Sequence, residues 1–511
     1  MASIVKSFGI EGVDGYLVEV EIKSISGTPM LSIVGLGDTA VKEAKERLEA
    51  VLSHKDFQFT KQKIVINLAP SNMKKRGSHY DLAMAIGLMI EAGKINPREI
   101  KKYGFIGELS LNGHLRPCSG VLPMIMAAKK NNIIDIIVPV DNIKEASLVN
   151  GVNIYGFSNI LSVKDFLEGK EYQMPILNDN KNESQDPYAI DFRDVQGQDG
   201  MIEYIILAAS GGHNMLMIGS PGCGKSMIAK RIPSILPTMS EEESLEVTKI
   251  YSVAGLLQKR GSLIEKRPFR APHQNASTNA LIGGGNNAMP GEISLAHNGV
   301  LFLDEIAEFN RKTLDALRQP MEDQNVTISR VSMTNTYPAN FMLIAAMNPC
   351  PCGHYGNERC KCTDYEVLKY RQKLSGPILD RMDIQKYVQP VKFMELSGHK
   401  EGRSSLELRE RVEAARKIQQ ERYKNIEHVN NNAQMTPALI KEFCELEEDG
   451  KKLLKLAYDR FQYSARTFHK FLKVSRTFAD MNGSKKIRKQ DVAAALLARD
   501  LDKEQSDMMV M

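Results

Sequence analysis

Residues 214–230 read Asn214-Met215-Leu216-Met217-Ile218-Gly219-Ser220-Pro221-Gly222-Cys223-Gly224-Lys225-Ser226-Met227-Ile228-Ala229-Lys230. The first five residues are an apolar run that predicts a buried strand, and the last four open a helix. The glycines between them permit the dihedrals with which backbone N–H groups turn inward around a phosphate. A chance glycine turn is the alternative, but a strand before it and a helix after it favour a phosphate-binding loop.

The residues expected to bind a nucleotide in this loop are Gly219, Ser220, Pro221, Gly222, Cys223, Gly224, Lys225 and Ser226. Lys225 is expected to reach the β- and γ-phosphates of ATP, and the Ser226 hydroxyl to bind Mg²⁺. A second apolar strand, 299–303, ends in Asp304 and Glu305. Asp304 fits the Mg²⁺ partner and Glu305 the catalytic group that polarises the attacking water. The sequence therefore predicts an ATP hydrolase.

Three further polar residues are candidates for the same chemistry. An apolar strand over 341–347 ends at Asn348, where an amide would lie beside the γ-phosphate and could orient the water. Arg381 stands in an acid-flanked turn, where a salt bridge at a helix end is the plain interpretation. Arg466 begins a helix from which it could fold onto the nucleotide.

The bulk composition bounds the class of protein. At 511 residues the chain suggests about three domains of roughly 150 residues. A net charge of +5 permits a polyanionic partner without requiring one. The N-terminus carries no apolar signal region, and no run approaches the roughly 18–20 apolar residues that span a bilayer. We expect a cytoplasmic protein with reduced thiols and no membrane partner.

The chain divides into four predicted regions. Residues 1–172 mix strands such as Ile64–Leu68 with helices such as Thr39–Leu52. Residues 173–190 are polar, without periodicity, and are expected to be a linker. Residues 191–392 alternate apolar strands with helices, as in a parallel α/β sheet, and residues 393–511 are expected to be helical. The predicted fold class is α/β.

Four of the seven cysteines form a C-x-C…C-x-C pattern: Cys350, Cys352, Cys360 and Cys362. Four thiolates suit a tetrahedral Zn²⁺, which would pin an insertion at about 350–362. Buried cysteines without a ligand are the alternative, and His354 is a candidate substitute ligand. The other cysteines, 118, 223 and 444, are scattered and are expected to be ordinary core or loop thiols.

These motifs together resemble the magnesium-chelatase-like AAA+ ATPases of the ComM/YifB type. The resemblance rests on the phosphate loop, 301–305, 345–353, the Arg381 turn and Ser464-Ala465-Arg466, in the family's order. It implies that Arg466 is sensor 2 and that Arg381 is a finger reaching a neighbour's nucleotide. A finger acting in trans implies a ring, usually a homo-hexamer. The resemblance also implies a helicase-type motor that promotes DNA branch migration during natural transformation, with a C-terminal helical lid.

The first region looks like the Lon-protease-type α+β domain found ahead of such motors, through 67–70 and 107–113. Lon-like proteolysis needs a serine nucleophile activated by a lysine. Asp81 aligns with the serine, although Ser78 is close enough to confuse the register, and Leu122 aligns with the lysine. We therefore expect a protease fold without protease activity.

Two insertions are candidates for contact with DNA. One is the glycine-rich stretch 283–291 with Asn286 and Asn287, and the other is a predicted hairpin over 326–338 that carries Arg330. In ring motors of this clade such insertions face the pore, although a glycine loop alone is usually only a loop. Many basic residues of the last region form either a solvated helix face or a phosphate-tracking surface. The chain has no Trp, so base-specific readout is not supported.

The leading functional interpretation is a hexameric, ATP-driven DNA translocase acting on single-stranded, forked or branched DNA. The alternative is the motor subunit of a metal chelatase that inserts Mg into a tetrapyrrole. The Lon-like region and the four-cysteine loop argue against the chelatase. A third interpretation, an ATP-dependent protease, is disfavoured because the lysine is missing.

Overall fold

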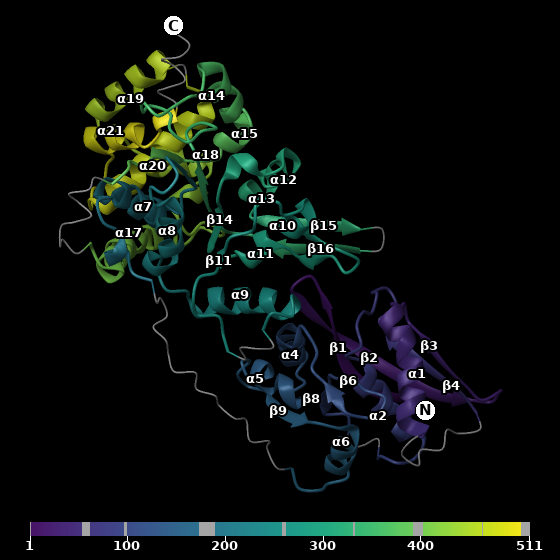
Figure 1. Ribbon diagram of the computed structural model, residues 1–511. Helices are drawn as coiled ribbons and strands as arrows, with labels where there is room; N and C mark the ends of the chain where they lie inside the picture. Colours follow the sequence, from purple (N-terminus) through teal and green to yellow (C-terminus); the bar gives the residue numbers. More distant parts are fainter. Residues whose placement is uncertain are drawn as a thin grey trace. The chain divides into compact units, whose positions relative to one another are not determined.

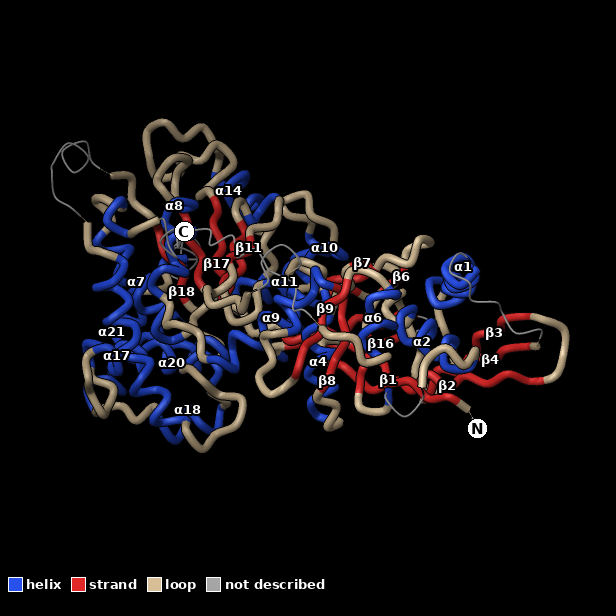
Figure 2. Tube along the Cα trace, turned by 90° about the horizontal axis from the view of Figure 1, so that it is seen from below, coloured by secondary structure: helices blue, strands red, loops and turns tan. Residues whose placement is uncertain are grey.

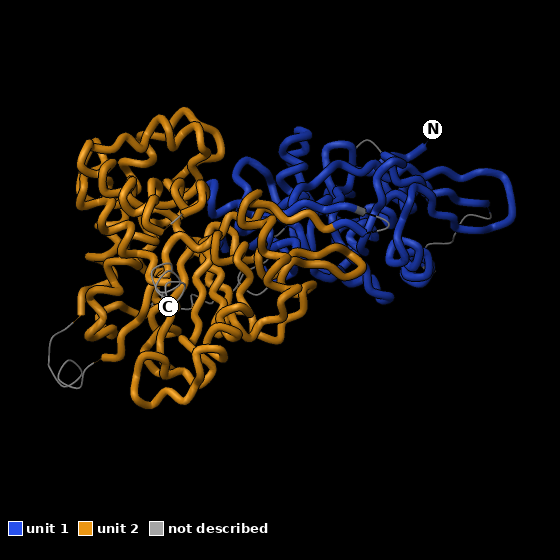
Figure 3. Tube along the Cα trace, turned by 90° about the horizontal axis from the view of Figure 1, so that it is seen from above, with its two compact units in different colours: residues 1–181, 241–264, 329–337 blue, residues 182–240, 265–328, 338–511 orange. Residues whose placement is uncertain are grey.

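The computed structural model describes residues 2–53, 62–96, 100–172, 190–257, 262–330, 333–391, 402–461 and 463–501. The chain forms two compact units, blue and orange in Figure 3. Unit 1 comprises the described residues of 1–181, 241–264 and 329–337, and unit 2 those of 182–240, 265–328 and 338–511. The predicted linker at 173–190 lies outside the described residues except for Ile190.

Unit 1 is built on a seven-stranded mixed sheet of order β3-β4-β2-β1-β5-β8-β9 (Figures 1 and 2). β2 pairs antiparallel with β1 and β4, whereas the other neighbours are parallel. Every second residue of β4 is buried, which confirms the strand predicted there. The bounds are β1 Ser3–Glu11, β2 Asp14–Ile25, β3 Met30–Val34, β4 Lys63–Ala69, β5 Tyr103–Phe105, β8 Asp135–Pro139 and β9 Asn153–Phe157.

Helices cover this sheet. α1 is one residue longer than predicted, and α2 is buried along nearly its whole length because it packs against β1 and β2. α4 packs on β2. The bounds are α1 Thr39–Ser53, α2 Asp81–Glu91, α4 Val121–Lys130, α5 Ile143–Ala146 and α6 Ile160–Leu167, with a short ribbon of β6 Glu108–Leu109 and β7 Leu115–Arg116.

One helix from the middle of the sequence, α9 (Glu241–Val253), belongs to unit 1. The Ser252 carbonyl accepts a hydrogen bond of 3.0 Å from the Gly120 N–H, and its hydroxyl donates one of 2.5 Å to buried Glu145. The same Glu145 oxygen accepts from the Leu122 N–H at 3.0 Å. Burial raises the pKa of Glu145. From the sequence pattern alone, this helix is expected to belong to the parallel α/β region of 191–392.

The predicted hairpin exists as β15 (Asn325–Arg330) and β16 (Met333–Pro338), which pair with each other. Its end, Ser329–Tyr337, also belongs to unit 1. There Thr334–Thr336 line a hollow together with the β1–β2 turn, Glu11–Tyr16. A Cβ on Gly12 would lie 3.0 Å from the Thr336 carbonyl oxygen, so the hairpin packs directly on this turn.

Unit 2 contains a five-stranded sheet of order β11-β14-β17-β10-β18, and all its pairings are parallel. The three central strands are completely buried, as expected for a parallel sheet covered on both faces. The predicted α/β core is therefore present. The bounds are β10 Met215–Ile218, β11 Phe269–Arg270, β14 Val300–Leu303, β17 Met342–Met347 and β18 Ile384–Tyr387.

Helices make up the rest of unit 2. α17 and α20 pack on α7, so the C-terminal helices share one apolar core with the sheet. No strand occurs among the described residues of 402–501. The main helices are α7 Asp199–Gly211, α8 Lys225–Arg231, α17 Ser405–Tyr423, α18 Pro437–Phe443, α19 Glu448–Phe461, α20 Ala465–Met481 and α21 Lys489–Leu497. Shorter ones are α10 Thr278–Ile282, α11 Glu292–Leu295, α12 Arg311–Asp315, α13 Arg318–Asp323, α14 Asp364–Arg371 and α15 Gly376–Leu379.

Candidate functional site

The predicted phosphate loop lies between β10 and α8. Gly222 and Gly224 have φ of +78° and +90°, a left-handed conformation that side chains disfavour, so glycine is needed at both positions. Lys225 is buried, and its Nζ donates to the carbonyl oxygens of Gly219 at 2.7 Å and Ser220 at 3.0 Å. The ammonium group therefore contacts the backbone of the loop in which it is expected to bind a phosphate.

The strand that is followed by Asp304 and Glu305, β14, brings Asp304 into contact with this loop. The Ser226 hydroxyl donates to Asp304 Oδ2 at 2.6 Å. Asp304 Oδ1 accepts from the Glu305 N–H at 3.0 Å. A hydroxyl and a carboxylate in contact are the two ligands that a Mg²⁺ at a phosphate loop would share.

Glu305 is exposed and has φ of +50°, a left-handed conformation that is strained for a residue with a Cβ. Strain of this kind costs on the order of 1–3 kcal/mol and is held in place by the surrounding structure. The turn lies between the end of β14 and a 3-10 helix over Ile306–Glu308, and it presents an exposed carboxylate. Such a carboxylate is available to a water molecule.

Asn348 follows β17, which lies between β10 and β14 in the sheet. Because the carboxyl ends of parallel neighbours meet at one edge, the three strands bring their polar residues together. Asn348 Oδ1 is 3.4 Å from Lys225 Nζ. One open cavity is lined by Pro221, Gly222, Gly224, Lys225, Ser226, Met227, Asp304, Glu305, Met347 and Asn348.

The two predicted arginines are not among the residues that line this cavity. Arg381 follows α15, where its Nη2 pairs with Glu322 at 2.5 Å and its Nη1 donates to the Pro377 carbonyl at 2.8 Å. Arg466 is exposed in the first turn of α20, behind the Ser464 cap. Within a single chain the structure thus unites the loop, both acids and Asn348, and leaves both arginines apart from them.

A buried series of polar contacts links the Arg381 segment to α20, and no local sequence pattern predicts it. His213 lies 3.0 Å from Asp383 through Nδ1 and 2.8 Å from the Thr477 hydroxyl of α20 through Nε2. Burial alone would raise the pKa of Asp383, but the His213 hydrogen bond and two nearby lysines lower it to about 2. Arg499 also donates to the Met382 carbonyl at 2.6 Å. Residues adjacent to Arg381 are therefore tied to the C-terminal helices.

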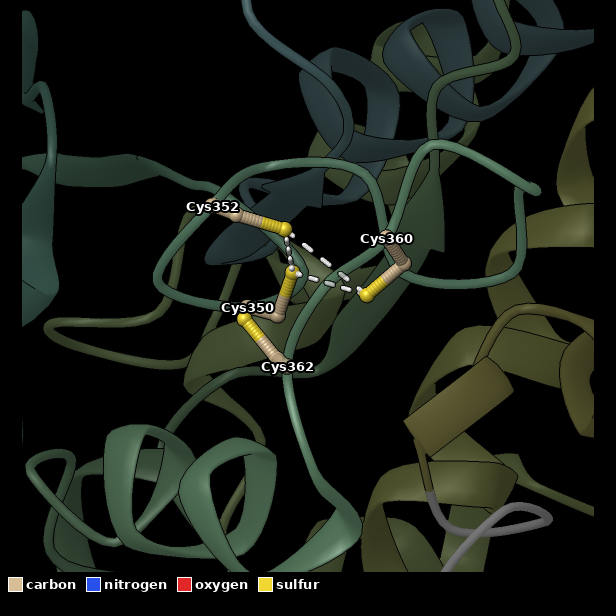
Figure 4. A group of neighbouring side chains, drawn as sticks. All are labelled: Cys350, Cys352, Cys360 and Cys362. Carbon is tan, nitrogen blue, oxygen red and sulfur yellow. Dashed lines mark hydrogen bonds between the residues drawn. The ribbon is translucent and has the colours of Figure 1, made fainter.

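The four predicted metal ligands lie together (Figure 4). The Sγ of Cys350 is 3.4 Å from that of Cys352 and 3.9 Å from that of Cys360, and the latter two are 3.7 Å apart. Together with Cys362, all four sulfur atoms lie within 4.8 Å of one another. Four thiolates at about 2.3 Å from Zn²⁺ form a tetrahedron with edges of about 3.8 Å, so the thiols fit this ion.

Two further observations bear on this cluster. All seven cysteines are free thiols. Backbone N–H groups of Lys361 and His354 lower the pKa of Cys352 to about 6, whereas burial and the neighbouring thiols raise the pKa values of Cys360 and Cys362. Among the described residues, the group that could hold a metal consists of the four cysteines and does not include His354.

The residues predicted to contact DNA are all exposed. Asn286 and Asn287 lie in the turn between β12 (Gly283–Gly284) and β13 (Met289–Pro290) of unit 2. Arg330 ends β15, and it belongs to unit 1. Their roles stay predictions.

The two residues aligned with a protease serine and lysine are both buried. Asp81 is completely buried at the start of α2, where Arg47 donates to both of its carboxylate oxygens at 2.7 and 3.1 Å. Leu122 is completely buried in α4. Among the residues that the structure describes, no helix is long and apolar enough to cross a membrane.

Comparison with known proteins covers nearly the whole chain. Residues 191–396 match the family model for magnesium chelatase, subunit ChlI. Residues 18–142 match subunit ChlI of Mg-chelatase, and residues 402–499 match the ChlI C-terminal model. The chain is 39% identical to competence protein ComM of Haemophilus influenzae over 97% of this chain and 96% of that protein. It is also 39% identical to the protein YifB of Escherichia coli, over 98% and 97% of the two chains.

A more distant similarity covers a shorter part of the chain. DNA replication licensing factor mcm-6 of Caenorhabditis briggsae is 26% identical over 171 residues, which cover 34% of this chain and 18% of that protein.

Proposed function

The chain belongs to the magnesium-chelatase-like AAA+ ATPases of the ComM/YifB type, and from this premise we propose that it is a ring-forming, ATP-driven DNA translocase. Its task would be the branch migration of recombination intermediates during natural transformation. The observation that carries the motor activity is the convergence of Lys225, Ser226, Asp304, Glu305 and Asn348 on one cavity. The names of a competence protein and of a replication licensing factor among its relatives support DNA as the substrate.

Phosphate binding falls to the loop and Lys225. The Lys225 ammonium already lies at carbonyl oxygens of the loop, so it needs only a local shift to pair with the β- and γ-phosphates of ATP. Ser226 and Asp304 would hold Mg²⁺, which neutralises phosphate charge when bound. Their contact of 2.6 Å keeps the two ligands together before the metal arrives.

Hydrolysis falls to Glu305 and Asn348. Glu305 accepts the proton of the attacking water, and the Asn348 amide orients that water by a hydrogen bond. Asn348 Oδ1 lies 3.4 Å from Lys225 Nζ, so the group that orients the water and the group that binds phosphate lie close together beyond the ends of two adjacent strands, β17 and β10. The left-handed turn at Glu305 directly follows Asp304, and both acids line the same cavity.

The two arginines support a homo-hexameric ring. Arg381 is absent from the cavity of its own chain, as expected of a finger that serves a neighbouring subunit. In this chain it pairs with Glu322, whose side chain is 56% exposed. The Arg381 side chain itself is 15% exposed, so to reach a neighbour's phosphate it must leave Glu322 and turn towards solvent. Arg466 would act as sensor 2 at the start of α20, and the C-terminal helices as the lid.

DNA is expected to contact Arg330, Asn286 and Asn287. The contacts would be made to phosphates, which explains why polar and basic residues suffice without aromatic stacking. The amino-terminal Lon-like domain would then serve assembly or DNA binding rather than proteolysis, since buried Asp81 and Leu122 stand at the protease positions.

The test is ATP turnover and junction migration with and without forked DNA over a salt series. We expect DNA to stimulate turnover several-fold at low salt. About six phosphate contacts would lower DNA affinity about 10³-fold between roughly 50 and 200 mM salt. Arg330→Ala should consume ATP while junction migration falls, whereas Lys42→Ala, an exposed lysine of α1, should behave as wild type.

Two outcomes of this test would contradict the proposal. If DNA leaves wild-type turnover unchanged even at low salt, DNA is not the substrate. Turnover that responds instead to a tetrapyrrole would indicate a chelatase motor.

A further inference from the structure

The four-cysteine loop touches the phosphate loop. It begins directly after β17 and Asn348, with Cys350 completely buried. Gly353 has φ of +81°, and a Cβ on it would lie 2.6 Å from Pro221 Cδ and 2.8 Å from Pro221 Cγ. Real Cβ atoms essentially never approach so closely. The backbone at Gly353 therefore packs directly on the proline of the phosphate loop.

Little besides the cysteines holds this loop in shape. No helix or strand occurs over residues 351–362. Its backbone–backbone hydrogen bonds are short-range turns, Gly353 to Cys350, Asn357 to His354 and Cys360 to Asn357. The one aromatic side chain, Tyr355, lies under Arg371 of α14, with 5.0 Å between the guanidinium carbon and the ring centre. A loop without an apolar core needs another source of order, and a bound metal supplies it.

We propose that one Zn²⁺, held by Cys350, Cys352, Cys360 and Cys362, fixes Gly353 against Pro221 and thereby supports the phosphate loop. Metal occupancy thus determines how well the chain binds a nucleotide. The metal site itself stands on the sulfur geometry (Figure 4), and only the nucleotide consequence rests on the proposed function.

The physical link is short. Pro221 is exposed and is followed by Gly222 at φ +78°, so the chain on either side of it is readily deformed. Zn²⁺ joins the start of the cysteine loop, at Cys350 and Cys352, to its end at Cys360 and Cys362. Without this closure Gly353 loses its fixed place, and Pro221 loses the surface on which it packs. The amides of 219–224 should then become more mobile.

The chain offers a matched pair of variants. Gly353 and Gly356 both have φ of +81°, so alanine strains the backbone equally at either position. A Cβ at Gly353 meets Pro221, whereas a Cβ at Gly356 has no atom within 4 Å. Comparing Gly353→Ala with Gly356→Ala therefore isolates the contact. The double variant Cys360→Ser/Cys362→Ser removes the metal instead.

Three measurements test the proposal on the full chain: zinc by elemental analysis, affinity for a fluorescent ADP analogue, and hydrogen exchange over 219–224. We expect about one Zn²⁺ per chain in wild type and in both glycine variants, and its loss in the cysteine variant. Gly353→Ala should weaken nucleotide affinity by about 10- to 100-fold, the scale of a forced contact in a packed site. It should also speed exchange over 219–224, whereas Gly356→Ala should leave both unchanged.

Two results would overturn the proposal. Wild-type protein prepared without chelators and found free of metal removes the zinc site. Equal exchange over 219–224 in the two glycine variants removes the contact, whatever the zinc content. Because exchange and metal content need no nucleotide, a wild type that binds no ADP analogue would count against the proposed ATPase alone.

Discussion

Glu305→Gln is expected to bind ATP with nearly wild-type affinity and to hydrolyse it about 10²–10⁴ times more slowly. The amide has the same shape as the carboxylate but cannot accept the proton of the attacking water. Ground-state binding persists because Lys225, Ser226 and Asp304 are unchanged. The loss therefore falls on the transition state, and turnover drops without a matching change in nucleotide affinity. Single-turnover hydrolysis and a nucleotide titration together measure both effects.

Two controls sharpen this result. Glu308→Gln changes a nearby exposed carboxylate that pairs with Lys373 at 3.0 Å, and it should hydrolyse ATP normally. Lys225→Ala should instead lose nucleotide binding, because a charge-assisted phosphate contact contributes on the order of 1.5–3 kcal/mol. Normal turnover in Glu305→Gln would show that another group activates the water.

The strands of the motor could be predicted from sequence because a parallel sheet is buried on both faces. β10, β14 and β17 are each completely buried, so each is a continuous apolar run. The polar residues that follow these runs meet at one edge of the sheet for the same reason. The proximity of Lys225 and Asp304 could therefore be predicted from local sequence patterns. The family resemblance was confirmed by relatives that span the chain.

Features that depend on packing between distant segments could not be predicted. α9 carries Ser252, whose bond to Glu145 joins residues 107 positions apart and places the helix in unit 1. The contact between Gly353 and Pro221 likewise has no local signature, since a glycine in a loop is expected in any case. Periodicity reports which face of an element is buried, and it does not report what covers that face.

The contacts around Arg381 could not be predicted from sequence either. Its motif was recognisable, but its partner Glu322 and the buried chain from Asp383 through His213 to Thr477 lie 59 to 264 positions apart in sequence. These contacts connect the segment of the proposed finger with α20, which carries Arg466 at its other end. A change at Arg466, the proposed sensor, would therefore have a packed, hydrogen-bonded route to the segment that we propose serves the next subunit.

Arg381→Ala is expected to slow hydrolysis by about 10³–10⁵, the scale of arginine fingers, while nucleotide affinity stays nearly unchanged. Affinity persists because Arg381 does not line the cavity of its own chain. Arg311→Ala, an exposed arginine at the start of α12, serves as the matched control and should hydrolyse ATP normally. Glu322→Gln should not reduce turnover, because it frees the guanidinium from its partner in the same chain.

Mixing the Arg381→Ala and Lys225→Ala proteins separates action in trans from action in cis. In a mixed ring an Arg381→Ala subunit keeps an intact nucleotide loop, and a Lys225→Ala neighbour can supply the missing arginine to it. Some turnover should therefore return at intermediate ratios, although each protein alone is inactive. Subunit exchange is verified independently by energy transfer between labelled chains. If labelled chains exchange and no mixture regains turnover, then Arg381 does not complete a neighbour's site. The proposal of a ring would then no longer be supported by the chemistry of Arg381.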